Sequence, residues 1–309
     1  MGSNFLLPPS RTEESLISEL RSAFLVLPSH VSVESAWLKN LDRLKNLVLN
    51  NDPRDFLHWD VIVKTMFIPD AVYTPVELCY LLCLSDFASR WRSAIKESPF
   101  GSPAPSRYYP DSSGNLLHHA YHLAQFESLY KTQVNDMNFI LEFGGGYGSM
   151  SRLYYNLGFS GRYIIFDLPE LSALQRYYLK SLGLPVLSVA DFVKGDEGVL
   201  CISDMHQLSS LFVDSSLFDV SMFIATWSLS EAPVTMRSLF LPFLSQFNFY
   251  LLAYQERFDN VDNIEYFSSF KDIFADVVWS NFQIPHIPGS YYLFGNTERE
   301  IQIEKVEKR

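Results

Sequence analysis

The feature that most constrains the fold is an apolar segment that runs directly into a cluster of glycines. Residues 137–143 are largely apolar, and four glycines follow within the five positions from Gly144 to Gly148. Apolar residues then recur at helical spacing, for example at Leu153 and Leu157. A buried strand, a glycine loop and a helix form the opening of a nucleotide-type α/β unit, in which the loop lets a ligand approach the backbone closely.

The spacing of the glycines indicates the kind of ligand. A dinucleotide fingerprint counted from Gly144 would need a third glycine where Ser149 stands, and a phosphate-binding loop would end in Gly-Lys-Ser/Thr, which is absent here. The acidic-x-Gly-x-Gly-x-Gly pattern, from Glu142 to Gly148, resembles the first motif of Rossmann-like S-adenosylmethionine (SAM) methyltransferases. SAM carries a sulfonium cation and no phosphate. Such a ligand requires backbone access and a nearby carboxylate rather than basic side chains.

An acidic residue after the second predicted strand supports this interpretation. Residues 163–166 are predicted to form a short buried strand, and Asp167 follows, 19 residues after Gly148. A carboxylate in this place can accept hydrogen bonds from both ribose hydroxyls. Asp167 could instead cap the helix that begins near Pro169. Because the glycine loop lies nearby, we favour ribose binding.

Further segments resemble one family. Phe166-Asp-Leu-Pro-Glu-Leu171, Leu174-Gln-Arg-Tyr-Tyr-Leu179 and Thr226-Trp-Ser-Leu-Ser-Glu231, together with the glycine motif, are similar to the sugar O-methyltransferase family over about residues 116–295. The resemblance implies methyl transfer from SAM to a hydroxyl of a sugar or sugar-containing small molecule. The fold class that we expect is α/β, with a Rossmann-like seven-stranded methyltransferase sheet and an N-terminal all-helical cap region.

The expected SAM site collects residues from the ends of several strands. Residues 184–189 are predicted as the third strand, so Asp191 and Phe192 would hold adenine, although an ordinary loop acid and a core aromatic fit equally. Tyr147 and Trp227 could face the sulfonium by cation–π attraction, or simply pack. The candidate cofactor-binding residues are Glu142, Gly144, Gly146, Tyr147, Gly148, Asp167, Leu168, Asp191, Phe192 and Thr226.

A hydroxyl acceptor must lose its proton, which calls for a general base. Glu231 follows the predicted fourth strand, residues 217–225, although it could instead favour a helix start. His286 lies in a loop between the two last predicted strands. His122 lies one helical turn from His118, and this pair lacks a third ligand that would complete a metal site. The candidate catalytic residues are therefore Glu231, His286 and His122, with no metal.

The chain divides into two predicted regions. Residues 1–115 form a helical region that ends in a Pro/Gly-rich loop at 98–115, and residues 116–309 form the catalytic domain. The loop could be a linker or an active-site lid. The helical region could pack as a cap, close a substrate cleft or form a homodimer contact.

The composition of the chain limits the classes of partner that we expect it to bind. The formal net charge of −11 disfavours nucleic acid, and the longest apolar stretch, residues 76–84, is too short to span a bilayer. Three cysteines and the lack of a secretion signal favour buried thiols in a reducing, cytoplasmic compartment. The expected partner is a small-molecule, carbohydrate acceptor. The alternatives are an NAD-dependent oxidoreductase, a non-catalytic SAM-binding subunit, and a methyltransferase acting on a non-sugar hydroxyl such as a phenol.

Overall fold

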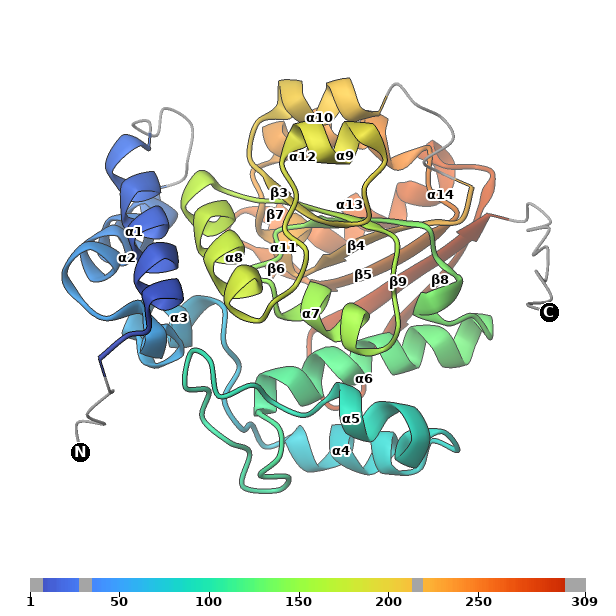
Figure 1. Cartoon of the computed structure of the whole chain (residues 1–309). Coiled ribbons are helices and arrows are strands. Elements are labelled where there is room, and N and C mark those ends of the chain that lie inside the picture. Colours follow the sequence, from blue (N-terminus) through green and yellow to red (C-terminus); the bar gives the residue numbers. More distant parts are fainter. Residues whose placement is uncertain (1–7, 28–34, 213–218, 298–309) are drawn as a thin grey trace, which may run out of the picture.

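The computed structural model describes residues 8–27, 35–212 and 219–297. A single large sheet runs through the molecule and helices cover both of its faces (Figure 1). Residues 217 and 218 of the predicted fourth strand lie outside the described residues.

The sheet has seven strands in the order β3-β2-β1-β4-β5-β9-β8. Their bounds are β1 Phe139–Phe143, β2 Arg162–Phe166, β3 Gly198–Ile202, β4 Ser221–Thr226, β5 Phe249–Gln255, β8 Val277–Gln283 and β9 Ser290–Thr297. The first five are parallel, whereas β9 runs antiparallel to both β5 and β8. The strand order reverses at β1, which pairs with both β2 and β4, and ligands of open α/β sheets bind outside the strand ends at such a point. The predicted fold class is confirmed.

Alternate residues of the central strands enter two apolar cores. Ile140 faces a core with the helices α6 (Gly114–Tyr130), α7 (Ser149–Asn156) and α8 (Pro169–Ser181). Phe139 and Leu141 face the other core, where the strands pack against α9 (Val189–Lys194), α10 (Met205–Leu211), α12 (Val234–Leu244), α13 (Asn263–Ser268) and α14 (Phe270–Ile273). Strands buried on both faces explain why β1 is apolar at nearly every position.

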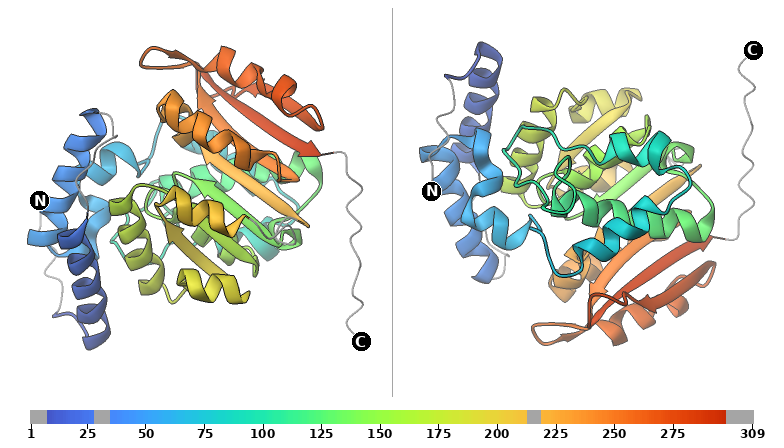
Figure 2. Two further views of the ribbon diagram at one scale, coloured as in Figure 1. Left: turned by 90° about the horizontal axis from the view of Figure 1, so that it is seen from above. Right: turned by 90° about the horizontal axis from the view of Figure 1, so that it is seen from below.

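The N-terminal segment is helical, as predicted. It comprises α1 (Arg11–Val26), α2 (Ser35–Asn50), η1 (Pro53–His58), α3 (Asp60–Thr65), α4 (Thr74–Leu82), η2 (Phe87–Trp91) and α5 (Arg92–Ala94). Helices α1 and α2 pack against α8, at the end of the molecule away from β8 and β9 (Figure 2). Phe56 of η1 packs against Tyr147 and Tyr178 at ring-centroid distances of 5.7 Å. The N-terminal helices thus share one core with the sheet, and the boundary at residue 115 stays a prediction.

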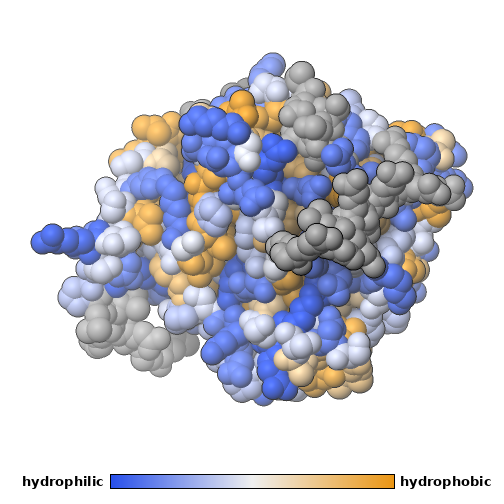
Figure 3. Space-filling view, turned by 45° about the vertical axis from the view of Figure 1, so that its right-hand side comes forward, coloured by the Kyte–Doolittle hydropathy of each residue, from blue (hydrophilic) through white to orange (hydrophobic). Residues whose placement is uncertain are grey.

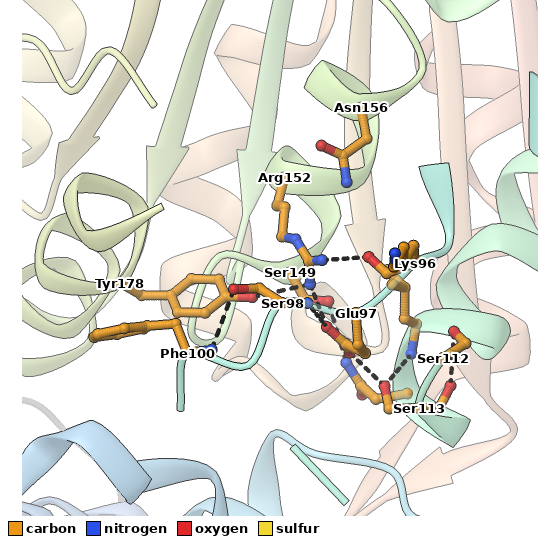
Figure 4. Close-up of polar contacts among 12 residues, drawn as sticks. Lys96, Glu97, Ser98, Phe100, Ser112, Ser113, Ser149, Arg152, Asn156 and Tyr178 are labelled. Carbon is orange, nitrogen blue, oxygen red and sulfur yellow. Dashed lines mark hydrogen bonds and ion pairs between the residues drawn. The ribbon is translucent and has the colours of Figure 1, made fainter. Parts of the chain in front are cut away.

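The Pro/Gly-rich loop is anchored rather than free. Arg152 of α7 is buried, and its guanidinium pairs with Glu97 and donates to the Lys96 carbonyl oxygen at 2.6 Å (Figure 4). The Glu97 carboxylate also accepts from the Ser113 hydroxyl at 2.6 Å. A buried ion pair in which both groups have further hydrogen-bond partners holds the two ends of the loop against α7. These contacts fix both ends of the loop, and its role as a linker or as a lid stays a prediction.

The predicted third strand was wrong. Within residues 184–189 only an isolated bridge forms, between Val186 and Val199. Ser188 ends the extended segment because its side chain caps α9 in a capping box. The third strand is β3, which pairs with β2 along its whole length.

The three cysteines differ in their exposure to solvent. All three cysteines are free, but Cys79 and Cys83 are exposed, so the prediction of buried thiols holds only for Cys201. Along the described segments no helix combines the length and the apolarity needed to cross a bilayer. Figure 3 shows one face of the molecule, on which apolar residues are interspersed with polar ones.

Candidate active site

A cavity of about 850 Å³ opens at the carboxyl ends of β1, β2 and β4. Its size lies within the roughly 300–1,000 Å³ that is usual for small-molecule sites. The glycine loop and Asp167 line one part, and nine residues between Thr226 and Leu239 line another. The N-terminal region supplies a further wall through residues 63–69. The cavity therefore needs both regions of the chain to be complete.

The backbone of the glycine loop faces this cavity. Gly144 has φ +71°, and a Cβ atom added there would lie 2.3 Å from the Cβ atom of Ser228, which follows β4. The Ser228 hydroxyl donates to the carbonyl oxygen of Phe143. The loop and the exit of β4 thus interlock so closely that only glycine fits at this position. Gly144 and Gly146 line the cavity as predicted.

Tyr147 and Gly148 do not line the cavity. Tyr147 is buried between Phe56 and Tyr178, and its hydroxyl accepts from the Asn115 side-chain amide at 2.9 Å. Gly148 is the N-cap of α7, with φ +96°. The Tyr147 ring points toward the N-terminal helices and cannot face a sulfonium in the cavity. The packing alternative considered for Tyr147 is the one that its ring contacts support.

Asp167 supports the glycine loop. Its Oδ2 atom accepts from the Gly146 N–H at 3.1 Å and from the Gln175 side-chain amide at 2.9 Å, and its Oδ1 atom accepts from the Leu168 N–H at 2.8 Å. Burial raises the pKa of Asp167 to about 7, against these hydrogen bonds, which lower it. Asp167 and Leu168 both line the cavity.

Glu142 is a second carboxyl group at the same end of the cavity. It is buried on β1, and its Oε2 atom accepts from the Tyr163 hydroxyl at 2.9 Å. Burial raises the pKa of Glu142 to about 8, and the charge of Asp167 contributes in the same direction. A positive charge placed in the cavity would stabilise both ionised carboxylates and lower both pKa values.

The exit of β4 contributes Thr226, Trp227 and Glu231 to the cavity wall. Trp227 has φ +62° and ψ −34°, a strained conformation for a residue with a bulky side chain. Glu231 ends α11 (Ser228–Glu231), and burial raises its pKa. Glu231 therefore lies on the cavity wall with a raised pKa, and its role as a base stays a prediction.

A chain of buried polar side chains lies behind this wall. The Nδ1 atom of His118 is 2.7 Å from Oε1 of Glu77, and its Nε2 atom is 2.9 Å from Nε2 of His122. His122 in turn hydrogen-bonds to the hydroxyl of Tyr292. The Nε2 atom of His286 lies 2.9 Å from the same Glu77 oxygen. The Trp227 ring stacks on the ring of His118 at a centroid distance of 5.4 Å.

The connectivity of this chain assigns the protons for the case of an ionised Glu77 beside a neutral His118. His118 then donates through Nδ1 to Glu77, so its Nε2 atom accepts from the Nε2–H of His122. His122 consequently accepts through Nδ1 from the Tyr292 hydroxyl. Burial, followed by the neighbouring imidazoles, lowers the pKa of His122 well below its usual range. Both nitrogens of His118 are therefore occupied within the protein.

The predicted histidines thus differ from Glu231 in position. His118 and His119 line the cavity, whereas His122 and His286 do not and contact Glu77 or His118 behind it. Burial lowers the pKa of His119 to about 3, so this ring is neutral near pH 7. Sequence reasoning did not identify Glu77 as part of this arrangement. The feature of the sequence that could have identified Glu77 is its place as an acidic residue inside the apolar stretch of residues 76–84.

Asp191 and Phe192 lie away from the cavity, which corrects the predicted adenine site. Asp191 is exposed on α9 and accepts from the Ser188 hydroxyl at 2.6 Å. Phe192 is buried in the core against Phe139. The error follows from the misplaced third strand. Ser203, which follows β3, lines the cavity in their place.

We next consider whether possible metal ligands cluster in the described part of the chain. Among the residues that the structure places, no group of three or more His, Cys, Asp or Glu side chains could hold a metal ion. The donors of His118 and His286 both point at one oxygen of Glu77 rather than at a shared empty position.

The fold and the site together define a Rossmann-like α/β protein with a cavity at the point where its strand order reverses. No protein-family model and no curated protein matches the sequence. The resemblance to sugar O-methyltransferases therefore stays a prediction from the sequence.

Solved structures with a similar arrangement include methyltransferases. The precorrin-6y C5,15-methyltransferase from Geobacter metallireducens is 14% identical over 66% of this chain and 97% of that chain, with a TM-score of 0.39. The methyltransferase domain of bacterial CtHen1 is 8% identical over 58% and 97% of the two chains, with a TM-score of 0.41. The N-terminal domain of human METTL16, solved in complex with SAH, is 7% identical over 59% and 70%, with a TM-score of 0.38. No functional assignment rests on likeness at this level.

Proposed function

We propose that the protein binds SAM in the cavity and transfers its methyl group to a hydroxyl of a small molecule. The observation that carries the proposal is the buried carboxyl group of Glu142 and the half-buried one of Asp167, beside the partly exposed Gly144 and Gly146. A cationic nucleoside without phosphate suits this end of the cavity. Asp167 would receive the ribose, and Leu168, Thr226 and Ser203 would surround the remainder of the nucleoside.

The charges disfavour the dinucleotide alternative. Among the lining residues in the described part of the chain there is one lysine, Lys64, and no arginine. Lys64 is exposed on α3, in the N-terminal region rather than beside the glycine loop. A pyrophosphate placed against Glu142 and Asp167 would have no compensating cation beside it, and its charge would oppose ionisation of both carboxyl groups.

The transfer itself requires an acceptor oxygen in line with the sulfonium methyl group, so orientation supplies much of the rate. The acceptor oxygen forms a bond to the methyl carbon as the bond from that carbon to sulfur breaks, and SAH leaves. Glu231, on the cavity wall with a raised pKa, would take the hydroxyl proton. The sequence resemblance adds a carbohydrate to the candidate acceptors, and a cytoplasmic location and a homodimer also stay predictions.

Calorimetric titration with SAM, SAH and NADH tests the proposal. We expect SAM and SAH to bind and NADH not to bind. Asp167→Asn should weaken SAM binding, because the amide cannot accept from the Gly146 N–H and the ribose as the carboxylate does. Asp191→Asn should leave the affinity unchanged, since Asp191 is exposed and outside the cavity.

Three results would contradict the proposal or one of its parts. Binding of NADH but not of SAM would favour the oxidoreductase. Equal SAM affinities for Asp167→Asn and the unaltered protein would remove Asp167 from the site. Binding of SAM without turnover on any hydroxyl acceptor would favour the non-catalytic subunit.

A further inference from the structure

The cavity wall beyond the glycine loop is rich in apolar side chains. Those that carry the argument are Trp37, Met66, Phe67, Trp227, Met236 and Ile287. The apolar surface continues to the mouth, where Val63 is 40% exposed and Leu239 is 61% exposed. Covering such surface contributes about 25 cal/mol per Å² of apolar area removed from water. The wall therefore favours a ligand with an apolar body.

Several polar side chains on the same wall already have partners inside the protein. Asn115 accepts from the Ile68 N–H at 3.0 Å and donates to the Tyr147 hydroxyl at 2.9 Å. The Thr65 hydroxyl donates to a backbone carbonyl oxygen at 2.6 Å. Both nitrogens of His118 are engaged, as described above. These groups line the cavity but contribute little hydrogen bonding to a ligand.

The hydrogen-bonding capacity of the wall suits an acceptor with few hydroxyl groups. Of the polar side chains that line this wall, Lys64 and Thr235 are exposed, whereas Tyr73, His119 and Glu231 are half-buried. The three half-buried groups can pair with two or three ligand hydroxyls. A free hexose would bring several hydroxyls out of water, and each unpaired one costs about 1–3 kcal/mol. The imbalance between apolar area and available polar groups disfavours a free sugar.

We propose that the acceptor carries its reacting hydroxyl on an aromatic or similarly apolar body, and that a free sugar is not the acceptor. This inference rests on the methyltransferase function proposed above and narrows its substrate class. The apolar body would lie between Trp227 and α12, with the hydroxyl directed toward Glu231. A glycoside whose sugar is attached to an aromatic group also belongs to this class, since it brings an apolar body to the same wall.

The test is a titration of the SAH-loaded protein with matched ligands. We would add 2-naphthol, phenyl β-glucoside and glucose separately in a calorimeter, and follow transfer of a labelled methyl group from SAM to each. The informative variant is Met236→Gln, since Met236 is half-buried on α12 and lines the cavity. The matched control is Val234→Gln, because Val234 lies on the same helix, is 49% exposed and does not line the cavity.

We expect 2-naphthol to bind and to be methylated, and glucose to do neither. Met236→Gln should weaken binding of 2-naphthol by roughly tenfold, as expected for loss of a good apolar contact. Val234→Gln should leave it unchanged, and both variants should keep the affinity for SAH. Binding or methylation of phenyl β-glucoside without that of glucose would also support the inference.

Three outcomes would overturn the inference while leaving the methyltransferase proposal intact. SAH binds but neither aromatic ligand binds, glucose binds as tightly as 2-naphthol, or Met236→Gln binds 2-naphthol as well as the unaltered protein does. Failure of SAH and SAM to bind would overturn the proposed function, and the acceptor class would fall with it.

Discussion

Glu142→Gln should make the protein more stable at high pH and change little at low pH. The carboxyl group of Glu142 is buried, and its pKa is raised from 4.5 to about 8. Glutamine has the same shape, keeps an oxygen that can accept from Tyr163, and does not ionise. The substitution therefore removes the ionisation and leaves the packing of β1 intact.

The sign and the magnitude follow from linkage between protonation and folding. Because the pKa is higher in the folded state, the unfolded chain releases this proton first, and stability falls as pH rises from about 4.5 to about 8. Each unit of pKa difference corresponds to about 1.4 kcal/mol, so the whole interval corresponds to roughly 5 kcal/mol. This loss of stability is absent below a pH of about 4.5 and complete above a pH of about 8.

Urea unfolding at pH 5, 7 and 9, followed by tryptophan fluorescence, measures this effect. The advantage of Glu142→Gln over the unaltered protein should grow by about 4 kcal/mol between pH 5 and pH 9. Glu265→Gln, at an exposed position on α13, is the matched control and should show no such growth. A constant difference between Glu142→Gln and the unaltered protein across this range would refute the reasoning, because it would mean that Glu142 titrates as an exposed group.

Three further predictions concern the loop, the base and the buried chain. Gly144→Ala should weaken SAM binding by roughly a hundredfold, because a Cβ atom at φ +71° meets the Ser228 side chain at 2.3 Å. The control Gly183→Ala, at φ +75° with no neighbour within 4 Å, should leave SAM binding unchanged. Equal SAM affinities for the two variants, measured by calorimetry, would contradict this prediction. Glu231→Gln should lower kcat by roughly 10²–10⁴-fold while the affinity for SAM is kept. The kcat of the unaltered protein should rise with pH through the raised pKa of Glu231. An unchanged kcat in the variant would exclude Glu231 as the base. Glu77→Gln should destabilise the protein by about 1–3 kcal/mol, since the charged acceptor of His118 is lost, and an unchanged urea midpoint would count against the hydrogen-bonded chain.

The sequence determined the parts of the fold that depend on local pattern. The apolar run before Gly144 predicted β1, and the glycines predicted a loop whose backbone can be approached closely; Gly144, Gly146 and Gly148 all have positive φ angles. Helical spacing predicted the helix that follows the loop. These predictions succeeded because a central strand and a tight loop restrict the residue types at consecutive positions.

The third strand shows where local pattern failed. Residues 184–189 and 198–202 are both short and apolar, so periodicity alone could not choose between them. The choice depends on pairing with β2, which Gly198–Ile202 achieves along its whole length. Asp191 and Phe192 were placed in the site as a consequence of this choice.

The sequence by itself determined that the chain builds a glycine loop at the end of a buried strand, with Glu142 and Asp167 beside it. Only the tertiary structure decided what closes the cavity and what stands behind its wall. Glu77 meets His118 and His286 because α4, α6 and the loop before β9 pack together. Hydrogen bonds between residues far apart in the chain leave no periodic trace in the sequence, since the chain spacing of the partners is set by the packing of whole elements.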